Sequence, residues 1–357
     1  MLYLIRGNDF KAKKWKEAAP EGVNIHLIKG SRISFGLKVF KKTIKLKARE
    51  VVVIQRYLND YPSLLKSILL LCTEICLLFY LKLRGIKFYW VCHNINRESH
   101  ENFPAILRIR RKLTIRDARK ILVLDPILVK YAKEKFHDFR GEILPISFGE
   151  YERNVSIHST KEAGEKKMLN GPNAFRSLSW TDLLTSIKSF RPQNGYLGFC
   201  AGSVLEKKKY LENIPKLIEA AKKQGKNLKL LVVSDLREIE NQELHQFLVS
   251  APEIFFVNSL VSLDLSELAH HIDFYWTGYD DWSMPYSVYT AVSTSTPTIT
   301  MNIGVLPRVM EEYEIGLTLS ENFENLNFCL EQLNEKRFAY TSFLGTHKWE
   351  NFGIIIQ

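Results

Sequence analysis

Residues 276–312 read WTGYDDWSMPYSVYTAVSTSTPTITMNIGVLPRVMEE, and the order of elements that they predict decides the fold class. The pattern is that of a loop, a short helix, a strand, a second loop and the start of another helix. Pro285 stands where the first helical turn begins, a position that tolerates the missing N–H of proline, and Pro297 opens the strand PTITM. At such a helix start, backbone N–H groups, the Ser287 hydroxyl and the helix dipole favour an anion. The stretch therefore predicts a unit that holds a phosphorylated ligand.

The same alternation of apolar strands and helices continues outward through the whole chain. In the second half, strands are predicted at 196–200, 228–234, 254–258, 273–277, 297–301 and 316–319, with helices near 210–224, 238–249, 262–270, 286–294 and 322–336. In the first half, strands are predicted at 2–5, 23–28, 51–55, 87–92, 120–124 and 141–146, with helices at 62–84, 104–117 and 126–136. Near-continuous apolar strands separated by helices are typical of parallel sheets that are covered on both faces. We therefore expect an α/β protein with two Rossmann-like domains.

Length and composition agree with a soluble protein of two domains. The chain has 357 residues, of which 46% are hydrophobic and 25% charged, and no secretory signal is recognised at its start. The five cysteines are odd in number and lack metal-ligand spacing, which favours a reducing cytoplasm. Cys72 and Cys76 lie one helical turn apart in an apolar stretch, where we expect them as small core residues.

The predicted domain boundaries follow the composition. Residues 1–150 form the first domain, 151–195 a polar linker or insertion, 196–340 the second domain, and 341–357 a tail that crosses back to the first. Within the linker, residues 180–190 predict a helix that Thr181 or Asp182 caps. Asp125 is likewise expected to cap the helix at 126–136.

Charge is divided unevenly between the two halves. Residues 1–150 hold 30 Lys and Arg against 14 Asp and Glu, whereas residues 151–357 hold 20 against 25. A basic face serves nucleic acid, an anionic membrane surface or a phosphate-bearing substrate. The basic stretch at 108–120 is either a solvated face or a surface that meets lipid phosphates. No helix-turn-helix, zinc-finger or RNP segment is recognised, so nucleic acid is not an expected partner.

The helix at 62–84 is long and very apolar, and it permits three interpretations. A membrane span fits its length, but Lys66 and Glu74 interrupt it and a clear strand follows. We favour a buried helix that covers the first sheet. The third interpretation is a helix whose face dips into a bilayer surface, in keeping with the positive charge nearby.

A second phosphate-binding segment lies at 199–220, FCAGSVLEKKKYLENIPKLIEA. Gly202 and Ser203 form a small turn after a strand, where a phosphate can approach the backbone, and the lysines at 207–209 supply positive charge. The alternative is a tight turn followed by a solvated lysine face. Strand ends follow at Ser234 and at the segment FFVNSLV (255–261).

These segments resemble the donor half of GT-B glycosyltransferases, whose two domains face a cleft, and the resemblance in strand order spans nearly the whole chain. It implies a set of donor-binding residues: Gly202, Ser203, Lys208, Ser234, Val257, Asn258, Leu260, Tyr279, Pro285, Tyr286, Ser287, Asn302 and Gly304. Many retaining members carry two glutamates around the proline. The matching positions here are Trp282 and Thr290, which favours an inverting enzyme, and Asp280 or Asp281 is a substitute carboxylate.

The first half offers a polar cluster in WVCHNINRESHENF (90–103), which resembles a His-Asn motif of bacterial GT-B enzymes that assemble surface polysaccharides. An inverting transferase needs a base that deprotonates the acceptor hydroxyl. Glu98 is the first candidate, followed by His93 and by Asp9 after the first strand. The expected acceptor-loop residues are Asn94, Arg97 and His100. A metal site is disfavoured because His93 and His100 lie seven residues apart without a thiolate partner. The alternative role of His93 is to order its loop.

The leading hypothesis is therefore a glycosyltransferase that moves a sugar from a nucleotide-sugar to a glycan or a lipid-diphosphate-linked oligosaccharide in cell-surface polysaccharide synthesis. It implies no cofactor and no metal, and a cytoplasmic protein that lies peripherally on the inner face of the membrane through its basic domain. The alternatives are a nucleotide-sugar epimerase of the same architecture and a non-catalytic basic protein that binds membrane or nucleic acid.

Overall fold

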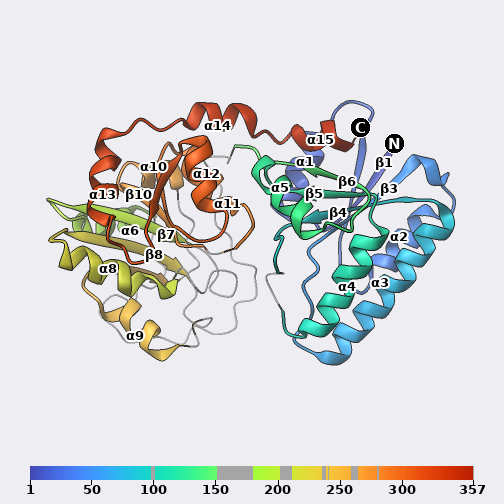
Figure 1. Cartoon of the computed structure of the whole chain (residues 1–357), viewed down its shortest axis with the longest axis horizontal. Helices are drawn as coiled ribbons and strands as arrows, with labels where there is room; N and C mark the ends of the chain where they lie inside the picture. Colours follow the sequence, from blue (N-terminus) through green and yellow to red (C-terminus); the bar gives the residue numbers. More distant parts are fainter. Residues whose placement is uncertain are drawn as a thin grey trace. The chain divides into compact units, whose positions relative to one another are not determined.

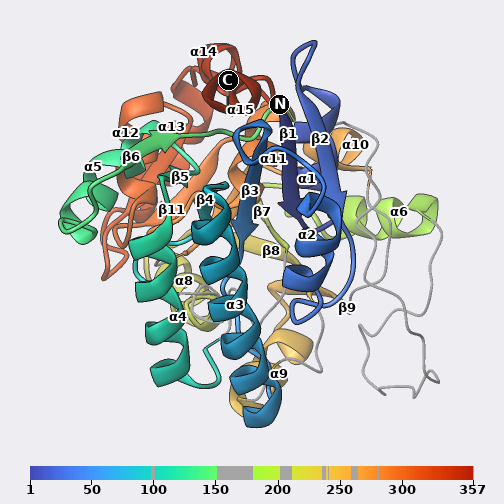
Figure 2. The same cartoon turned by 90° about the vertical axis from the view of Figure 1, so that its right-hand side faces the viewer.

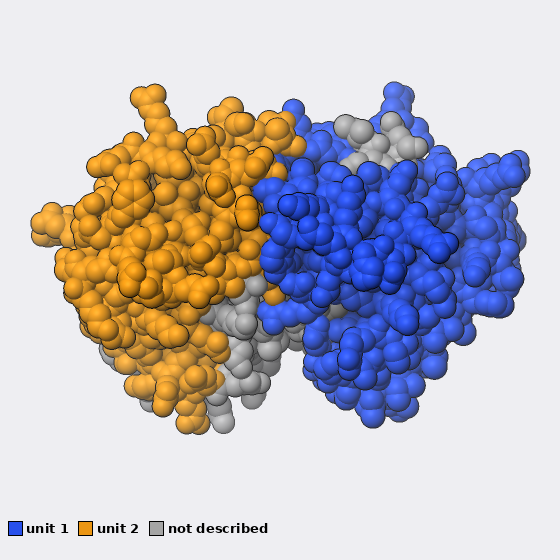
Figure 3. Space-filling model, viewed as in Figure 1, with its two compact units in different colours: residues 1–149, 282–284, 347–357 blue, residues 150–281, 285–346 orange. Residues whose placement is uncertain are grey.

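The computed structural model describes residues 1–97, 101–150, 180–201, 211–234, 239, 241–258, 264–279 and 281–356. The chain divides into two compact units, coloured separately in Figure 3. Unit 1 comprises Met1–Gly149, Trp282–Met284 and His347–Gln357, and unit 2 comprises Glu150–Asp281 and Pro285–Thr346. The C-terminal segment 347–357 thus belongs to the same unit as the N-terminus.

Unit 1 (Figure 1) contains a six-stranded parallel sheet in the order β2-β1-β3-β4-β5-β6, which can be followed in Figure 2. Its strands are β1 (Leu2–Arg6), β2 (Asn24–Ile28), β3 (Val51–Arg56), β4 (Lys87–Cys92), β5 (Lys120–Val123) and β6 (Glu142–Pro145). Its helices are α1 (Phe10–Glu17), α2 (Phe35–Thr43), α3 (Leu64–Arg84), α4 (Pro104–Asp117), α5 (Pro126–Lys135) and α15 (Asn351–Ile356). Every residue of β3 is buried, as expected for a central parallel strand that is covered on both faces. Trp15 of α1 stacks on Phe352 of α15 at 4.7 Å between ring centroids.

Unit 2 contains a second parallel sheet in the order β12-β11-β10-β7-β8-β9. Its strands are β7 (Tyr196–Ala201), β8 (Leu228–Ser234), β9 (Ile254–Asn258), β10 (Phe274–Thr277), β11 (Thr298–Met301) and β12 (Gly316–Leu319). Its helices are α6 (Trp180–Phe190), α8 (Ile214–Lys223), α9 (Gln242–Ser250), α10 (Leu265–Ala269), α11 (Tyr286–Ser293), α12 (Leu306–Tyr313), α13 (Leu326–Glu335) and α14 (Tyr340–Thr346). Apolar clusters lie on both faces of the sheet, one with side chains of α8, α9 and α13 and the other with α6, α10 and α11.

The predicted fold class is confirmed, because each predicted strand is present within two residues of its expected bounds. Helices α1, α2, α14 and α15 lie outside the predicted ranges, since each has nine residues or fewer and gives only a short periodic signal. The predicted cap of α6 is wrong, because the helix begins at Trp180 and places Thr181 and Asp182 in its first turn. The cap at Asp125 is confirmed by a 2.8 Å bond that its carboxylate accepts from Ile127 N–H.

Helix α3 differs from the favoured interpretation of a buried covering helix. Its inner residues Leu70, Leu77 and Leu81 are buried in unit 1, but the opposite face is exposed and includes Cys72 and Cys76. The expectation that both cysteines are core residues is therefore wrong. Among the described residues, α3 is the one helix that is long and apolar enough to cross a membrane, and only 28% of its apolar window is buried.

Candidate functional site

The strand order of unit 1 reverses direction between β1 and β3. In open parallel sheets the crevice at the carboxyl ends of the strands beside such a reversal is where ligands bind. Both strands end in arginine, β1 at Arg6 and β3 at Arg56, and β4 beside β3 leads directly into His93. The topology therefore places two guanidinium groups and an imidazole at one edge of the sheet.

Four buried or half-buried arginines gather at this edge, and we name them the arginine cluster: Arg6, Arg32, Arg56 and Arg110. Their side chains are held by backbone carbonyls as well as by carboxylates. Arg32 Nη1 donates to Asn59 and Asp60 carbonyl oxygens at 2.7 and 2.8 Å. Arg110 donates to Glu74 through Nε at 2.6 Å and Nη2 at 2.8 Å, the bidentate geometry that guanidinium favours.

The cluster carries more positive charge than its carboxylates neutralise. Arg6 donates through Nη2 to the Tyr57 carbonyl oxygen, while its Nη1 lies 4.0 Å from the Glu74 carboxylate. Burial lowers the pKa of the Arg6 guanidinium to about 10, an effect that Glu74 opposes and that the neighbouring arginines increase. Arg6 Nη1 and Arg56 Nε are buried without a hydrogen-bond partner among the described residues. Buried, incompletely paired cations of this kind are suited to an anionic ligand.

Asp9 serves the cluster structurally. Its Oδ1 accepts 2.9 Å bonds from Ala12 N–H, which caps α1, and from Arg56 Nη1. Burial alone would raise the pKa of the Asp9 carboxyl, but the charge and hydrogen bond of Arg56 outweigh it and hold the pKa below its ordinary value. The preceding Gly7 has φ +110°, and a Cβ there would lie 3.3 Å from Arg56 Nη1. Asp9 is therefore a firmly ionised, engaged carboxylate, which suits positioning of Arg56 better than proton abstraction.

His93 lies against the ring of Tyr57, with centroids 3.8 Å apart and planes 10° from parallel. Tyr57 has φ 37°, a left-handed conformation that non-glycine residues rarely adopt and that often accompanies functional sites. Burial, and then the charges of Arg56, Lys11 and Arg6, lower the pKa of His93 well below its ordinary value. The imidazole is therefore neutral at pH 7. Its Nε2 is buried without a hydrogen-bond partner within the described part of the chain.

The remaining predicted residues of this loop have different positions. Asn94 is buried, and its Oδ1 accepts bonds from Asn96 N–H at 3.0 Å and Arg97 N–H at 3.5 Å, so it shapes the loop. Arg97 is exposed. Glu98 and His100 lie outside the described residues.

The arginine cluster is the part of this site that the sequence analysis missed. Its signal is nevertheless present, because the apolar strands LYLIR and VVVIQR each end in an arginine at their carboxyl end.

Unit 2 has an equivalent reversal between β7 and β10. The carboxyl end of β10 leads through Gly278 and Tyr279 toward α11, and the Tyr279 N–H donates to the Thr277 carbonyl oxygen at 2.7 Å. Helix α11 begins at Tyr286, the first residue of the predicted helix at 286–294, and Pro285 is its N-cap. Ser287, in the first turn, is partly exposed. The predicted donor residues of this segment therefore do lie beside the switch point of their sheet.

Other predicted donor residues occupy neighbouring strand ends of unit 2. Ser234 ends β8 and is buried, and Val257 and Asn258 end β9. Asn302 follows β11, where its N–H donates to the Leu319 carbonyl oxygen at 2.8 Å, and Gly304 has φ +72°. The predicted residues Gly202, Ser203, Lys208 and Leu260, with Asp280 and the lysines at 207 and 209, lie outside the described residues.

The two positions that match the glutamates of retaining enzymes have structural roles here. Trp282 belongs to unit 1, where its carbonyl oxygen accepts a 3.0 Å bond from Ile95 N–H and its ring packs edge-on against Tyr131. Thr290 is buried in α11 and donates to the Tyr286 carbonyl oxygen at 3.3 Å. Asp281 is buried, and its carbonyl oxygen accepts a bond from Val305 N–H at 3.4 Å.

Metal ligation finds no support in the part of the chain that the structure describes. No group of three or more His, Cys, Asp or Glu side chains lies close enough there to hold an ion.

Comparison with solved structures establishes the fold. Anabaena HepE in complex with UDP and glucose is similar over 100% of this chain and 98% of its own, at 12% identity and a TM-score of 0.59. Sucrose-phosphate synthase from Thermosynechococcus elongatus matches 99% of this chain and 96% of its own, at 13% identity and a TM-score of 0.63. WaaG, a glycosyltransferase involved in lipopolysaccharide biosynthesis, matches 100% and 98%, at 13% identity and a TM-score of 0.54. The chain has the GT-B fold, with its two Rossmann-like domains.

Sequence comparison adds nothing to this. No family model matches the chain, and no curated protein matches it.

Proposed function

We propose that this protein is a glycosyltransferase that transfers a sugar from a nucleotide-sugar donor to a hydroxyl of a glycan or lipid-linked acceptor. The observation that carries the proposal is the whole-length likeness to GT-B structures, among them HepE in complex with UDP and with UDP-glucose. The ligand positions expected for such a fold, at the switch point of each sheet, hold polar and charged residues in both units.

The proposed reaction is a displacement at the anomeric carbon. The acceptor oxygen forms the new glycosidic bond, the bond from the anomeric carbon to the donor phosphate breaks, and the nucleoside diphosphate leaves. The acceptor proton passes to a base on the protein. We propose inversion of configuration, because Trp282 and Thr290 replace the carboxylates that many retaining enzymes carry.

Donor binding is assigned to unit 2. The start of α11 offers unsatisfied backbone N–H groups and the Ser287 hydroxyl to the diphosphate. Gly202, Ser203 and the lysines at 207–209, which lie outside the described residues, are assigned further contacts on the basis of the sequence. These groups balance the charge of the leaving diphosphate, so the proposal includes no metal.

Acceptor binding is assigned to unit 1. The arginine cluster attracts a phosphate-bearing acceptor, and the neutral His93 imidazole beside it is able to accept a proton or to orient the acceptor hydroxyl. Glu98, the first candidate base from the sequence, lies outside the described residues and stays a candidate for this role. A lipid-diphosphate-linked oligosaccharide fits both the cluster and a location at the inner face of the cytoplasmic membrane, and such acceptors serve cell-surface polysaccharide synthesis.

Donor binding is tested first by thermal shift of the purified full-length chain against nucleoside diphosphates and their sugar conjugates. We expect one base series to raise the melting temperature. Ser287→Asp should abolish that rise, because a carboxylate at the helix start repels the diphosphate. Ser189→Asp, on an exposed turn of α6 in the same unit, is the matched control and should retain it. The absence of a shift with every nucleotide at millimolar concentration contradicts the donor site.

Product analysis separates the enzyme classes. A transferase releases a nucleoside diphosphate and forms a glycoside, whereas an epimerase returns an isomeric nucleotide-sugar and a non-catalytic binder changes neither. Turnover that persists in EDTA supports the metal-free proposal, and loss of turnover that Mg²⁺ or Mn²⁺ restores contradicts it. The anomeric configuration of the isolated glycoside decides between inversion and retention.

A further inference from the structure

Exposed large apolar side chains are concentrated on three helices of unit 1. Of the thirteen such residues in the described part of the chain, eleven belong to α2, α3, α4 or the residue that ends α2. They are Leu37, Phe40, Ile44, Leu64, Leu65, Ile68, Leu69, Ile75, Phe79, Leu83 and Ile109. Helix α3 packs beside both α2 and α4 (Figure 2), so the eleven side chains belong to one helical layer, which we name the α2–α4 layer. Concentration of this degree marks an interaction surface, whereas scattered apolar residues do not.

Helix α3 contributes most of this layer through a continuous outward stripe. Together with the exposed Cys72 and Cys76, its exposed apolar residues follow one another at steps of one, three and four, which keeps them on one face of the helix. The exposed fractions reach 76% for Leu65, 63% for Phe79 and 70% for Leu83. The opposite face holds Leu70 and Leu81 inside unit 1. A surface helix normally presents a polar face to water, so this outward stripe requires a cover.

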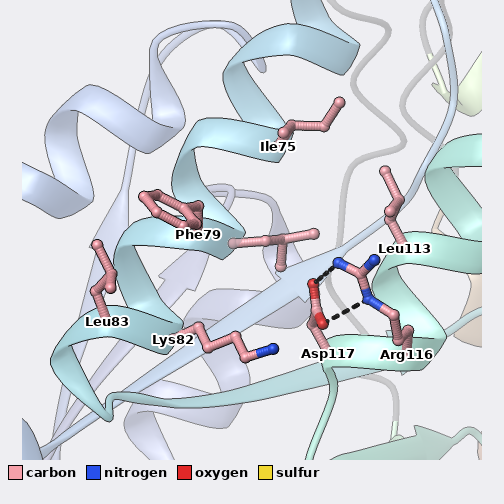
Figure 4. A pocket seen from close by; sticks show the side chains of 8 residues that line it. Ile75, Phe79, Lys82, Leu83, Leu113, Arg116 and Asp117 are labelled. Carbon is pink, nitrogen blue, oxygen red and sulfur yellow. Dashed lines mark hydrogen bonds and ion pairs between the residues drawn. The ribbon is translucent and has the colours of Figure 1, made fainter.

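A groove of about 410 Å³ between α3 and α4 adds to the same surface. Figure 4 shows Ile75, Phe79 and Leu83 of α3 on one side and Leu113 of α4 on the other. Arg116 and Asp117, joined by bonds of 2.8 and 2.7 Å, lie at its end near Lys82. The groove is thus apolar along its length and charged at one end.

The charge of the layer is of one sign. Its exposed charged residues are Lys38, Lys41, Lys42, Lys66, Lys82, Arg108, Lys112 and Arg116. Helices α2, α3 and α4 are fully described, and their acidic residues are Glu74 and Asp117. Both are partly buried against arginines, so no acidic side chain of these three helices is exposed. Apolar side chains surrounded by lysine and arginine match the interface of an anionic bilayer. A second copy of the chain would set like charges against each other, which disfavours self-association through this face.

We propose that the α2–α4 layer docks on an anionic membrane, with α3 lying in the plane of the interface and its outward side chains inserted among the acyl chains. A spanning orientation would remove Leu70 and Leu81 from the core of unit 1 and separate Glu74 from Arg110. The docking surface rests on the peripheral membrane location proposed above and gives it a structural basis. Vesicle binding and nucleotide binding are measured separately, so that either proposal can fail alone.

The test is co-sedimentation of the full-length chain with vesicles of phosphatidylcholine, alone or mixed with phosphatidylglycerol. We expect binding to the anionic vesicles that weakens as salt rises. The double variant Phe79→Ser, Leu83→Ser should lower the partition coefficient at least about tenfold, because two inserted apolar side chains are lost. Phe328→Ser is the matched control, since Phe328 is 58% exposed on α13 of unit 2 and should leave binding unchanged.

The natural cysteines report insertion directly. Cys72 and Cys76 are exposed on the outward stripe, whereas Cys92, Cys200 and Cys329 are buried, so a polarity-sensitive thiol dye labels the stripe selectively. We expect a blue shift of its emission on anionic vesicles. The proposal is overturned if anionic vesicles do not bind, if the double variant binds as well as the wild type, or if the dye emission is unchanged. A dimer in solution that this double variant dissociates would equally overturn it, because a second copy would then cover the stripe.

Discussion

Replacement of Glu74 by glutamine tests whether the buried charges of the arginine cluster depend on this carboxylate for their stabilisation. The Glu74 side chain is 12% exposed and accepts two bonds from Arg110, whose side chain is fully buried. It also accepts a 3.1 Å bond from Gln55 Nε2 and lies 4.0 Å from Arg6. Glu74→Gln keeps the volume but removes the negative charge and turns one end of the side chain into a donor facing Arg110.

The expected cost is that of an uncompensated buried charge, about 3–5 kcal/mol in the free energy of unfolding of unit 1. For a unit of this size each kcal/mol lowers the melting temperature by about 2–4 °C, so we expect a decrease of roughly 6–20 °C. Scanning calorimetry is the appropriate assay, because the two units are able to unfold in separate transitions and only one should move.

The control for this prediction is Glu142→Gln. Glu142 pairs with Lys120 at 3.1 Å, but its side chain is 65% exposed, so the expected loss is below about 1 kcal/mol. Inorganic phosphate should stabilise Glu74→Gln more than the wild type, because an anion replaces the missing carboxylate. A variant with the melting temperature of the wild type would refute the reasoning that Arg6 and Arg110 depend on Glu74.

Three further predictions follow from described residues. The pKa of His93 is lowered in the folded chain, so below pH 6.5, the ordinary pKa of histidine, the unfolded chain binds a proton that the folded chain does not. Unit 1 should therefore lose stability as the pH falls. His93→Asn should flatten this pH dependence in melting curves recorded at a series of pH values. A thiol reagent should react with two cysteines in the native protein, Cys72 and Cys76, and with all five after denaturation. The other three cysteines are buried, and burial raises the pKa of the Cys329 thiol to about 11. Reaction of a third thiol in the native protein at a comparable rate would contradict this burial. Gly7→Ala should destabilise unit 1 by about 1–3 kcal/mol, because φ +110° strains a residue with a Cβ and Arg56 Nη1 lies close by; denaturant midpoints equal to those of wild type would count against that strain.

The sequence predicted the strands well because each is a short apolar run between turn residues. VVVIQ at 51–55 and LKLLVVS at 228–234, for example, became β3 and β8 with at most one residue of difference. Burial on both faces removes the alternation of polar and apolar residues, so the run itself identifies a parallel strand. The helix start after Pro285 was placed to within one residue because proline restricts the backbone locally.

The sequence predicted only part of the site, because the residues of the site come from strands that are far apart in the sequence. The candidates His93 and Asp9 are strand-end residues that local patterns reveal. Arg56 pairs with Asp9 at 2.9 Å, and its guanidinium lies about 5 Å from the ring centroids of both Trp15 and Tyr57, but it comes from a different strand. The sequence around Arg56 does not indicate which carboxylate pairs with it. The pairing of Asp9 with Arg56 therefore became visible only in the fold.

The sequence by itself determined the strands, the parallel α/β class, the basic first half and the residues that end each strand, because hydrophobic runs, turn residues and charge are local properties. Only the tertiary structure decided which residues share an environment. It brought Arg6, Arg56 and His93 to one edge of a sheet, since strand order joins segments far apart in sequence. It also decided which apolar face of α3 is buried: a helix that is apolar all round gives no periodic signal, and only packing against unit 1 distinguishes Leu70 inside from Leu65 outside.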